Sequence, residues 1–388
     1  MIHRICLAIL MALTLTFVGC KKPPTLGQPN YNQSLPQGAF GLRQITDPAQ
    51  MPDLQPVADQ LQDPAFRQAL ERSLRWFPIA STKSFFPVGP ISHDHAHASV
   101  YALSQIRSRE QLQREFDVWE SVGWNGQGQV LYTAYYTPAF RASPTRTGPY
   151  QYPLYKRPAD LRTDPATGQV LGTYPTRSQL EQSGQLRQSE LIYLPSRLDA
   201  YIIEVNGSAQ LTLTNGQTVY VGYAGTNGHD YTSLGRELVR DRKLPETGAT
   251  LPAIKRYFDQ HPEELETYIA RNDRMVFFQF YDGANWPAGS LGFQVTPMRS
   301  LATDKAIFPR GCAVLVDTTF PDGRQSFKQL MLDQDTGGAI RAAGRADIYA
   351  GIGASAAHAA GQQKAMGQLY YLLLKPDRVP YWHNQMAR

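Results

Sequence analysis

The chain has 388 residues, of which 42% are hydrophobic and 18% are charged. This composition excludes a largely disordered protein, and the length allows two domains with buried cores. The formal net charge is only +5 and the Lys and Arg residues are scattered, so the sequence lacks the basic stripe of a nucleic-acid-binding protein. The 31 Gly, 28 Pro and 21 Tyr residues favour many short strands and turns over a helical bundle.

The N-terminus has the pattern of an export signal. Arg4 precedes a short apolar run over residues 5–18, which is too short to span a bilayer and is typical of a signal peptide. The run leads into Phe17-Val18-Gly19-Cys20, which is similar to the lipobox of bacterial lipoproteins, with Phe17 where Leu is usual. We therefore predict a signal peptide over residues 1–19 and a lipid on Cys20 that holds the protein on a membrane. The alternative is an ordinary secretory signal in which Cys20 is incidental.

The segment after the signal is predicted to be a tether. Seven prolines lie between residues 23 and 56 without apolar periodicity, so an extended segment is expected over residues 20–56. With Cys6 in the signal and Cys20 lipidated, only Cys312 remains and an internal disulfide is excluded. Cys312 precedes an apolar run, so we interpret it as a small buried residue.

Helices are predicted next. Asp63 followed by Pro64 is an N-cap with a proline at the first helical position, and Ser92 is a second N-cap. Apolar repeats predict two further helices, one through Leu112, Phe116 and Trp119 to Gly123, and one over residues 252–271.

Strand signals dominate from residue 130 onward. Asn215-Gly216 before the apolar run 219–221 is a strong hairpin signal. Runs of aromatic and β-branched residues predict strands at 131–136, 201–205, 209–213, 275–278, 313–316, 330–332 and 369–374.

Two local motifs invite a functional interpretation that the sequence does not support. His93 and His97 lie one helical turn apart, which suits a zinc pair, but no third ligand follows and a solvated helix start is favoured. The segment Gly351-Ile352-Gly353 lacks the third glycine and the strand–turn–helix setting of a dinucleotide loop, so a turn is expected. The sequence therefore predicts no metal and no cofactor.

An aspartate-rich stretch runs from Asp333 through Asp335 to Asp347. The pair Gly337-Gly338 after Asp335 permits a tight turn and close approach of a ligand to backbone N–H groups. Asp347 precedes an apolar residue pair, where desolvation would raise its pKa and keep it protonated, as cleavage of a glycosidic bond requires. On these residues alone, catalysts and turn caps both remain possible.

Ordered motifs in the chain resemble a known family. Those in the C-terminal part are similar to the three-aspartate domain, and those upstream, taken with them, are similar to the membrane-bound lytic murein transglycosylase A family over roughly residues 57–375. The motifs are Ser300 to Asp304, Ile307 to Gly311, Asp335 to Ile340, Asp347 to Tyr349, Tyr135 to Pro138, Tyr152 to Tyr155, Asn206 to Ser208 and Tyr223 to Tyr231.

The resemblance implies a mainly β fold with N-terminal helices. It implies a double-psi β-barrel catalytic domain over residues 57–141 and 279–388, interrupted by a smaller inserted β domain over residues 142–278, with the sugar groove between them. The loop from Ile340 to Asp347 is about one residue longer than the commoner family pattern.

The resemblance also implies the activity. Such enzymes cleave the β-1,4 bond between N-acetylmuramic acid (MurNAc) and N-acetylglucosamine (GlcNAc) of peptidoglycan, leaving a 1,6-anhydro ring, with one aspartate as both acid and base. That aspartate matches Asp347 here. The resemblance assigns supporting or substrate-binding roles to Asp335, Asp304, Gly337, Gly338, Tyr136, Thr137, Gly207 and Ser208.

Two other functions stay open at this point. One is a glycoside hydrolase that uses water on the same barrel, with Asp335 or Asp304 as the base, and the other is a murein-binding lipoprotein without activity. The expected partners are glycan strands, a membrane through the lipid anchor and murein synthases, without nucleic acid. The expected location is the periplasmic face of the outer membrane.

Overall fold

The computed structural model describes residues 30–36, 38–164, 169–321 and 323–386. The predicted signal peptide and Cys20 lie outside the described residues. Within these ranges, no helix is both long enough and apolar enough to cross a bilayer.

Part of the segment predicted to be a tether is folded. Strand β1 (Leu42–Gln44) pairs with β2 (Phe116–Ser121), and helix α1 (Gln55–Gln60) follows a short 3-10 turn, η1 (Pro48–Gln50). The side chains of Leu42, Ile45 and Leu54 are buried in the main core. The tether prediction is therefore wrong for residues 42–56, because widely spaced apolar residues there reach the core without any periodic pattern.

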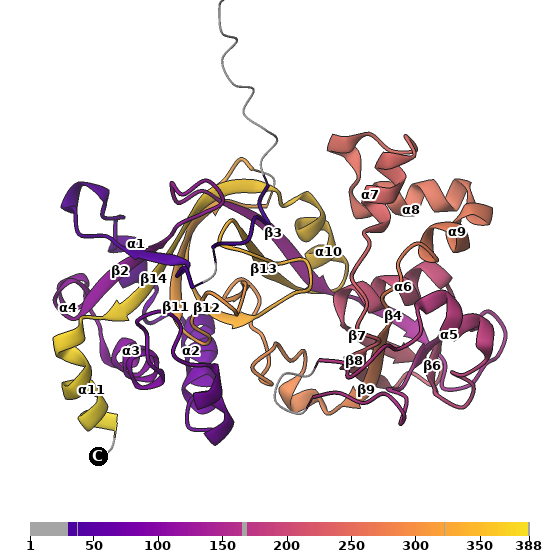
Figure 1. Cartoon of the computed structure of the whole chain (residues 1–388), viewed down its shortest axis with the longest axis horizontal. Helices are drawn as coiled ribbons and strands as arrows, with labels where there is room; N and C mark the ends of the chain where they lie inside the picture. Colours follow the sequence, from indigo (N-terminus) through magenta and orange to yellow (C-terminus); the bar gives the residue numbers. More distant parts are fainter. Residues whose placement is uncertain (1–29, 37, 165–168, 322, 387–388) are drawn as a thin grey trace, which may run out of the picture. The chain divides into compact units, whose positions relative to one another are not determined.

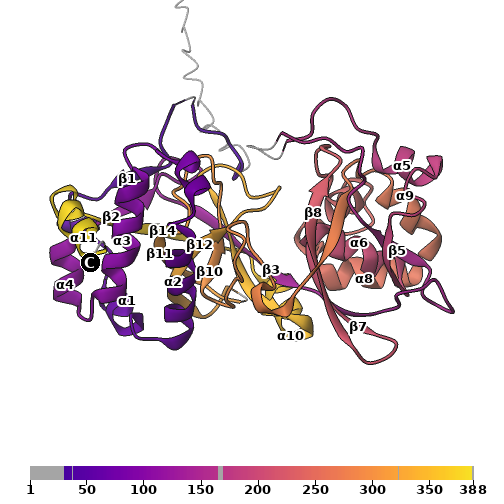
Figure 2. The same ribbon diagram turned by 90° about the horizontal axis from the view of Figure 1, so that it is seen from below.

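The N-terminal helices follow the predicted caps. The side chain of Asp63 accepts a hydrogen bond from the N–H of Phe66 at the start of α2 (Pro64–Trp76), and Ser92 caps α3 (His93–Gln105) in the same way. Helix α2 packs against strand β12 (Ser326–Asp335) and α3 against strand β14 (Ala365–Leu374) (Figure 2). A 3-10 segment, η2 (Ala80–Phe85), lies between them.

The helix predicted to run on to Gly123 ends early. Helix α4 (Arg109–Glu115) begins at a Ser108 capping box and is followed at once by strand β2. Phe116 and Val118 alternate into the core because β2 pairs with β14 on one side and β1 on the other. The i,i+4 spacing of Leu112 and Phe116 fits a helix, and sheet pairing overrides it.

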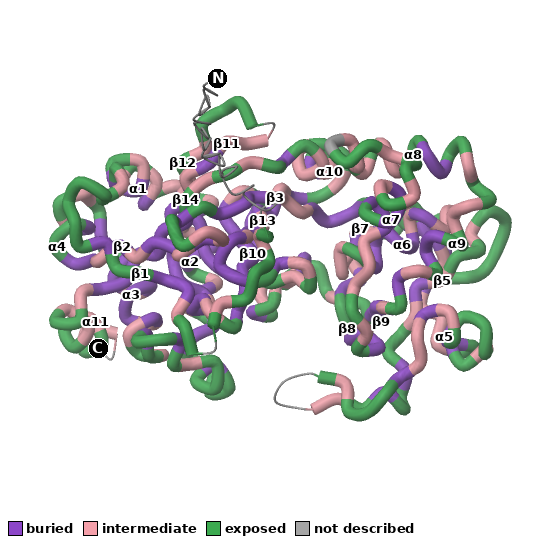
Figure 3. Tube along the Cα trace, turned by 45° about the horizontal axis from the view of Figure 1, so that its top comes forward, coloured by how far each residue is buried: buried purple, intermediate pink, exposed green. Residues whose placement is uncertain are grey.

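The first sheet holds the core of the larger half of the chain (Figure 1). Its strand order is β1-β2-β14-β11-β12-β10-β13-β3, and β14 also pairs with β3, so the hydrogen-bonded order returns on itself. Figure 3 shows that buried residues concentrate in these strands. The remaining strands are β3 (Val130–Thr137), β10 (Ser300–Ala302), β11 (Ala313–Thr319), β12 (Ser326–Asp335), β13 (Arg345–Ile352) and β14 (Ala365–Leu374).

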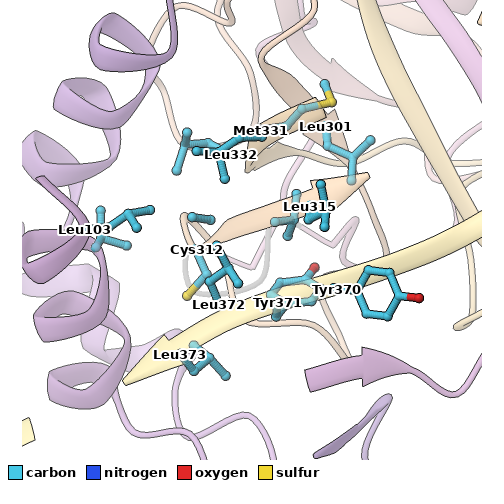
Figure 4. Close-up of a cluster of buried hydrophobic side chains, with 14 of the residues drawn as sticks. Leu103, Leu301, Cys312, Leu315, Met331, Leu332, Tyr370, Tyr371, Leu372 and Leu373 are labelled. Atoms are coloured by element: carbon cyan, nitrogen blue, oxygen red, sulfur yellow. The ribbon is translucent and has the colours of Figure 1, made fainter. Parts of the chain in front are cut away.

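Cys312 lies inside this core. Its side chain is fully buried among aliphatic side chains such as Leu372 (Figure 4), and burial raises the pKa of its thiol. The interpretation of Cys312 as an unreactive buried residue is thus supported.

A second set of strands forms the middle of the chain. One sheet has the order β4-β7-β8-β9, and β5 pairs with β6 beside it. The Asn215-Gly216 turn joins β7 to β8 with Gly216 at a φ of +85°, which confirms the predicted hairpin. The strands are β4 (Ala139–Ala142), β5 (Tyr152–Tyr155), β6 (Glu190–Leu194), β7 (Ser208–Leu213), β8 (Thr218–Thr226) and β9 (Val276–Tyr281).

The strand predicted at residues 201–205 is wrong. These residues lie in helix α6 (Arg197–Asn206), which Ser196 caps at its start and Gly207 ends with a φ of +76°. Tyr201 and Ile202 pack into one buried cluster and Ala200 and Ile203 into another. The sequence of a helix that is buried on two sides resembles that of a buried strand, because no polar face recurs at helical spacing.

The helix predicted over residues 252–271 is interrupted. Helix α8 (Leu251–Gln260) stops before Pro262, and a 3-10 turn, η4 (Pro262–Glu264), separates it from α9 (Leu265–Ile269). His261 has an extended φ of −132° because the proline that follows disfavours helical geometry. The other helical segments are α5 (Arg177–Ser183), α7 (Leu234–Arg240), η3 (Glu246–Gly248), η5 (Gly283–Asn285), α10 (Gly353–Gln362), η6 (Pro376–Arg378) and α11 (Val379–Met386).

Candidate active site

Asp347 is placed by the parallel pairing of β13 with β3. In this register Asp347 lies opposite Thr133, and Tyr349 lies opposite Tyr135. Because side chains alternate along a strand, Arg345, Asp347 and Tyr349 share one face of β13. The two strands together gather polar side chains from distant parts of the chain around one carboxyl group.

The Asp347 carboxyl group is half-buried and has one hydrogen-bonded oxygen. The Thr133 hydroxyl donates to its Oδ1 atom at 2.7 Å. Burial raises the pKa of Asp347 to about 6, although the Thr133 hydrogen bond and the charge of Arg345 act against that rise; the negative charge of Asp335 adds to it. A carboxyl group with this pKa can both give and take a proton near neutral pH.

Asp335 stands at the end of β12 and is held on both oxygens. Tyr135 donates its hydroxyl proton to Oδ2 at 2.6 Å, and the N–H groups of Ser290 and Thr336 donate to Oδ1 at 2.9 and 2.8 Å. Burial raises the pKa of Asp335, against these three hydrogen bonds. With its oxygens engaged, Asp335 is arranged to fix Tyr135 and the following loop.

Asp304 holds the other end of that loop. Its buried carboxylate accepts hydrogen bonds from the N–H of Ala306 at 3.0 Å and from the N–H of Ala342 at 2.8 Å. Ala342 has a φ of +64°, a conformation that is costly for a residue with a side chain. The Asp304 contact therefore stabilises the strained backbone that leads into β13.

Gly337 and Gly338 form the turn between β12 and β13. The carbonyl oxygen of Gly337 accepts a hydrogen bond from the N–H of Ile340 at 3.0 Å. A Cβ atom on Gly337 would lie 3.1 Å from the Ile340 side chain, whereas one on Gly338 would meet nothing within 4 Å. The backbone at Gly338 is thus exposed and open to close approach.

The side chains of β3 divide between its two faces. Thr133, Tyr135 and Thr137 share the face of Asp347, and the Thr137 and Tyr349 hydroxyls are 3.0 Å apart. Tyr136 points the other way, where desolvation and the charge of Asp199 in α6 raise the pKa of its phenol to about 12. The structure therefore brings Thr137 to the site but not Tyr136.

Sequence reasoning missed Thr133, Tyr135, Tyr349 and Arg345 as parts of the site. Strand alternation from Thr137 would have identified Thr133 and Tyr135. Tyr349 and Arg345 lie two residues on either side of Asp347, so the same alternation would have identified them. The pairing of β3 with β13 could not be predicted from the sequence.

Gly207 and Ser208 lie in the second set of strands. Gly207 ends α6 and Ser208 begins β7, where it pairs with Gly222 of β8. None of the described hydrogen bonds or ion pairs joins either residue to Asp347.

The histidine-rich start of α3 is packed rather than solvated. His93 Nε2 lies 3.0 Å from the Thr82 hydroxyl, and the His95 ring is 2.8 Å from the carbonyl oxygen of Leu374. The His97 ring stacks on Phe77, and burial lowers its pKa to about 4. The expectation of a solvated helix start is wrong, because these imidazoles anchor α3 to its neighbours.

The glycines at 351 and 353 also differ from expectation. They join β13 directly to α10, with φ values of +116° and +80°, so the segment is a strand–helix junction rather than an isolated turn. Elsewhere, His261, Glu263 and Glu264 bring three possible metal-ligand atoms together, but Glu264 is engaged by Lys243 and Tyr257.

Two family models match this chain. The MltA specific insert domain matches residues 131–279, and the 3D domain matches residues 299–373. The second range contains Asp304, Asp335 and Asp347, and the first contains the second set of strands except the end of β9.

Relatives of known name match most of the chain. The membrane-bound lytic murein transglycosylase A of Escherichia coli K12 is 30% identical over 276 residues, which cover 69% of this chain and 72% of that protein. The protein of the same name from Vibrio cholerae is 30% identical over 270 residues, covering 67% and 70%.

Solved structures match the fold. A membrane-bound lytic murein transglycosylase from Agrobacterium tumefaciens has a TM-score of 0.73 at 22% identity and covers 88% of this chain and 100% of its own. E. coli MltA with bound chitohexaose has a TM-score of 0.69 at 25% identity, covering 90% and 97%. The chain belongs to the family of the membrane-bound lytic murein transglycosylase A enzymes.

Proposed function

We propose that this enzyme cleaves the β-1,4 bond between MurNAc and GlcNAc in peptidoglycan and leaves a 1,6-anhydro ring on the muramoyl residue. The observation that carries the proposal is the single half-buried carboxyl of Asp347, whose pKa of about 6 suits both halves of the reaction. The names of the relatives, and the sugar oligomer bound to one of them, support murein glycan as the substrate.

The reaction needs one carboxyl group and no water molecule. Protonated Asp347 donates its proton to the glycosidic oxygen as the bond from that oxygen to C1 of the muramoyl sugar breaks. The ionised carboxylate then accepts the proton of the C6 hydroxyl while the C6 oxygen bonds to C1. Because that hydroxyl belongs to the same sugar, proximity replaces the second carboxylate that inverting hydrolases use to activate water.

Thr133 orients the acid in this scheme. Its hydroxyl donates to Oδ1, so the catalytic proton resides on Oδ2, the oxygen that Thr133 leaves available. Once Asp347 is ionised, the same bond stabilises the carboxylate until it takes the C6 proton. Thr133 is a positioning residue because it acts through Asp347.

The remaining residues support the loop and the glycan. Asp335 and Asp304 hold the two ends of the Gly337-Gly338 turn, and the exposed backbone of that turn is assigned to glycan contacts. Thr137 acts through Tyr349, and Gly207 and Ser208 are assigned to glycan contacts on the second set of strands.

The domain limits form part of the same proposal. We assign residues 57–141 and 279–388 to a double-psi β-barrel and residues 142–278 to the insert. The return of the strand order through the pairing of β14 with β3 supports the barrel.

The membrane attachment is proposed from the sequence. A signal peptide over residues 1–19 and a lipid on Cys20 would place the enzyme on the periplasmic face of the outer membrane, near the murein synthases. Cys20→Ser should move the protein from the membrane fraction to the soluble fraction and abolish labelling by radioactive palmitate. Labelling that persists in this variant would contradict the assignment.

Product analysis tests the chemistry. Digestion of purified murein should release muropeptides with 1,6-anhydro ends, each lighter by one water than the corresponding reducing end, as measured by mass spectrometry. Asp347→Asn should abolish release, while Asp317→Asn, which changes a surface carboxylate paired with Lys328, should retain it. Reducing muramic ends would instead indicate a water-using hydrolase, and binding of murein without any product would indicate a wall-binding protein.

A further inference from the structure

The second set of strands carries a cavity that the cleavage chemistry does not use. It has a volume of about 780 Å³ and is lined by residues of β6, β8, β9 and the segment after β5. Tyr223 and Phe280 contribute aromatic rings that are 50% and 52% exposed. A cavity with exposed rings is suited to a ligand that has an apolar part.

The polar side of this cavity is basic. Lys156 and Arg157 both line it and are exposed, and the described lining residues include no Asp or Glu. None of the ion pairs between described residues joins either cation to a carboxylate. Desolvation raises the pKa of Tyr223 while the charges of Arg274 and Arg157 oppose that rise, so a third cation acts on the same ring. The cavity therefore attracts an anion.

Arg157 is held in place rather than free in solvent. Its Nη2 atom donates to the carbonyl oxygen of Leu161 at 2.6 Å and to the Thr163 hydroxyl at 3.0 Å. Its side chain lies against Gly225, where a Cβ atom would come within 3.2 Å of Arg157 Cδ. Gly225 has a φ of +148°, so both its conformation and its lack of a side chain make room for the arginine.

The chemistry of the substrate identifies the occupant. In a glycan strand that carries its peptides, the sugars are uncharged, since the lactyl carboxyl of each muramoyl residue is amide-linked to the stem. The carboxylates of the polymer then lie on the stem peptide, which also has aliphatic side chains. Glycan alone offers this cavity no charge to bind, whereas a stem peptide offers both carboxylates and apolar groups.

The sheet that carries the cavity also contacts the strand beside Asp347. Strand β8 pairs with β7, and β7 contacts β3, whose Thr133 hydroxyl donates to Asp347. A stem bound at Lys156 and Arg157 would thus lie on a sheet that touches the strand supporting the proposed acid.

We propose that this cavity binds the carboxylate-bearing stem peptide of the glycan strand being cleaved, with Lys156 and Arg157 as the carboxylate contacts. The proposal rests on the proposed function for its substrate. It makes the stem peptide a determinant of which strands the enzyme cleaves fastest.

The test compares two substrates that differ only in charge. Uncrosslinked murein strands are used as they are, or after carbodiimide amidation of their carboxylates. The wild-type enzyme should have a kcat/KM about three- to tenfold higher on the native strands, the range expected for two exposed ion contacts. Lys156→Gln combined with Arg157→Gln should remove this preference and leave the rate on amidated strands unchanged.

A matched control removes the same charge elsewhere. Arg187→Gln with Arg256→Gln changes two exposed arginines outside the cavity and should keep the preference. The proposal would be overturned if the cavity variant lowered kcat/KM equally on native and amidated strands, or if it changed kcat/KM on neither. Circular dichroism of each variant verifies that the fold is intact.

A binding measurement separates this proposal from the cleavage chemistry. The free stem tetrapeptide is titrated into wild-type and variant protein at low and high salt. Saturable binding to the wild type that is lost in the cavity variant supports the stem site even if no anhydro product forms, in which case only the proposed function fails. Binding that is the same in both proteins would overturn the stem site whatever the products are.

Discussion

The ionised form of Asp347 is costly to the folded protein. Its pKa rises from 3.8 to about 6 on folding. Between these values the folded state holds a proton that the unfolded chain has released, so stability falls as the pH rises through that window. Above about pH 6 the folded protein bears the full free-energy cost of burying the ionised carboxyl group.

The amide of an asparagine escapes this cost. We expect Asp347→Asn to be inactive and yet more stable than wild type at pH 7, by about 1–2 kcal/mol after allowance for partial exposure of the carboxyl. The gain should vanish near pH 4. Urea unfolding at both pH values measures it, and a less stable variant at pH 7 would show that the carboxylate is well solvated or paired.

The rate should depend on pH through the same group. Because the proposed reaction begins with protonated Asp347, kcat/KM should decline as the pH rises through about 6. The Thr133 hydrogen bond lowers this pKa, so Thr133→Val should move the decline to higher pH and also slow kcat about tenfold. Thr133→Ser keeps the hydroxyl and serves as the control. A decline at an unchanged pH in Thr133→Val would contradict the contact.

At this scale the sequence identified the aspartates as candidates but not the side chains around them. Asp347, Asp335 and Asp304 lie within motifs that are recognisable in order. Thr133 and Tyr135 lie 214 and 200 residues before the aspartates that they contact, and the β3–β13 register brings this strand beside them. Tyr136, which the motif marks for the groove, lies on the other face of β3 from Thr133 and Tyr135; a motif shows which residues recur and not which face of the strand they occupy.

Among the elements, α5 and α6 are joined by a buried ion pair. Arg177 is 1% exposed, and its guanidinium donates to both carboxylate oxygens of Glu204 at 3.1 and 2.6 Å. It also donates to the carbonyl oxygens of Asn272 and Arg274, before β9. One side chain therefore ties two helices to the entry of a strand.

Removing one partner should destabilise this region strongly. Arg177→Met leaves the Glu204 carboxylate buried without its cation, and we expect a loss of about 3–5 kcal/mol in the free energy of unfolding. Adding Glu204→Leu should recover part of that loss, because the uncompensated charge is gone. Urea denaturation checks both, and a loss below about 1 kcal/mol in the single variant would mean that water reaches the pair.

Elements were predicted well where a local signal was sufficient. The caps at Asp63 and Ser92 and the Asn215-Gly216 turn act over a few residues, and the structure confirms all three. Helix α6 and strand β2 were misassigned, because burial on two sides and pairing with β14 depend on distant residues.

For the whole molecule, the folded body begins earlier than the proline content suggests. Among the described residues, deleting residues 1–38 removes the packing of Leu35 on the core and of Tyr31 on Trp124, so it should lower the melting temperature only slightly. Deleting residues 1–56 also removes Leu42, Ile45 and Leu54 from the core and exposes the edge of β2, so we expect a loss of roughly 2–6 kcal/mol. Differential scanning calorimetry distinguishes the two, and equal melting temperatures would restore the tether to its full predicted length.

The two chain segments that connect the first sheet with the second differ in length. Strand β3 passes into β4 through Pro138 alone, whose ring fixes φ near −65° and whose carbonyl oxygen is bonded to Gln210 of β7. The return from β9 to β10 takes residues 282–299. A displacement of the second sheet is therefore transmitted to Thr137 by the short connection through Pro138 and also by the contacts of β7 and α6 with β3. The longer connection is tied at both ends, because Trp286 Nε1 donates to the carbonyl oxygen of Val221 and the N–H of Ser290 donates to Asp335. If the second sheet holds the polymer, tension on the polymer would reach the proposed acid through β3.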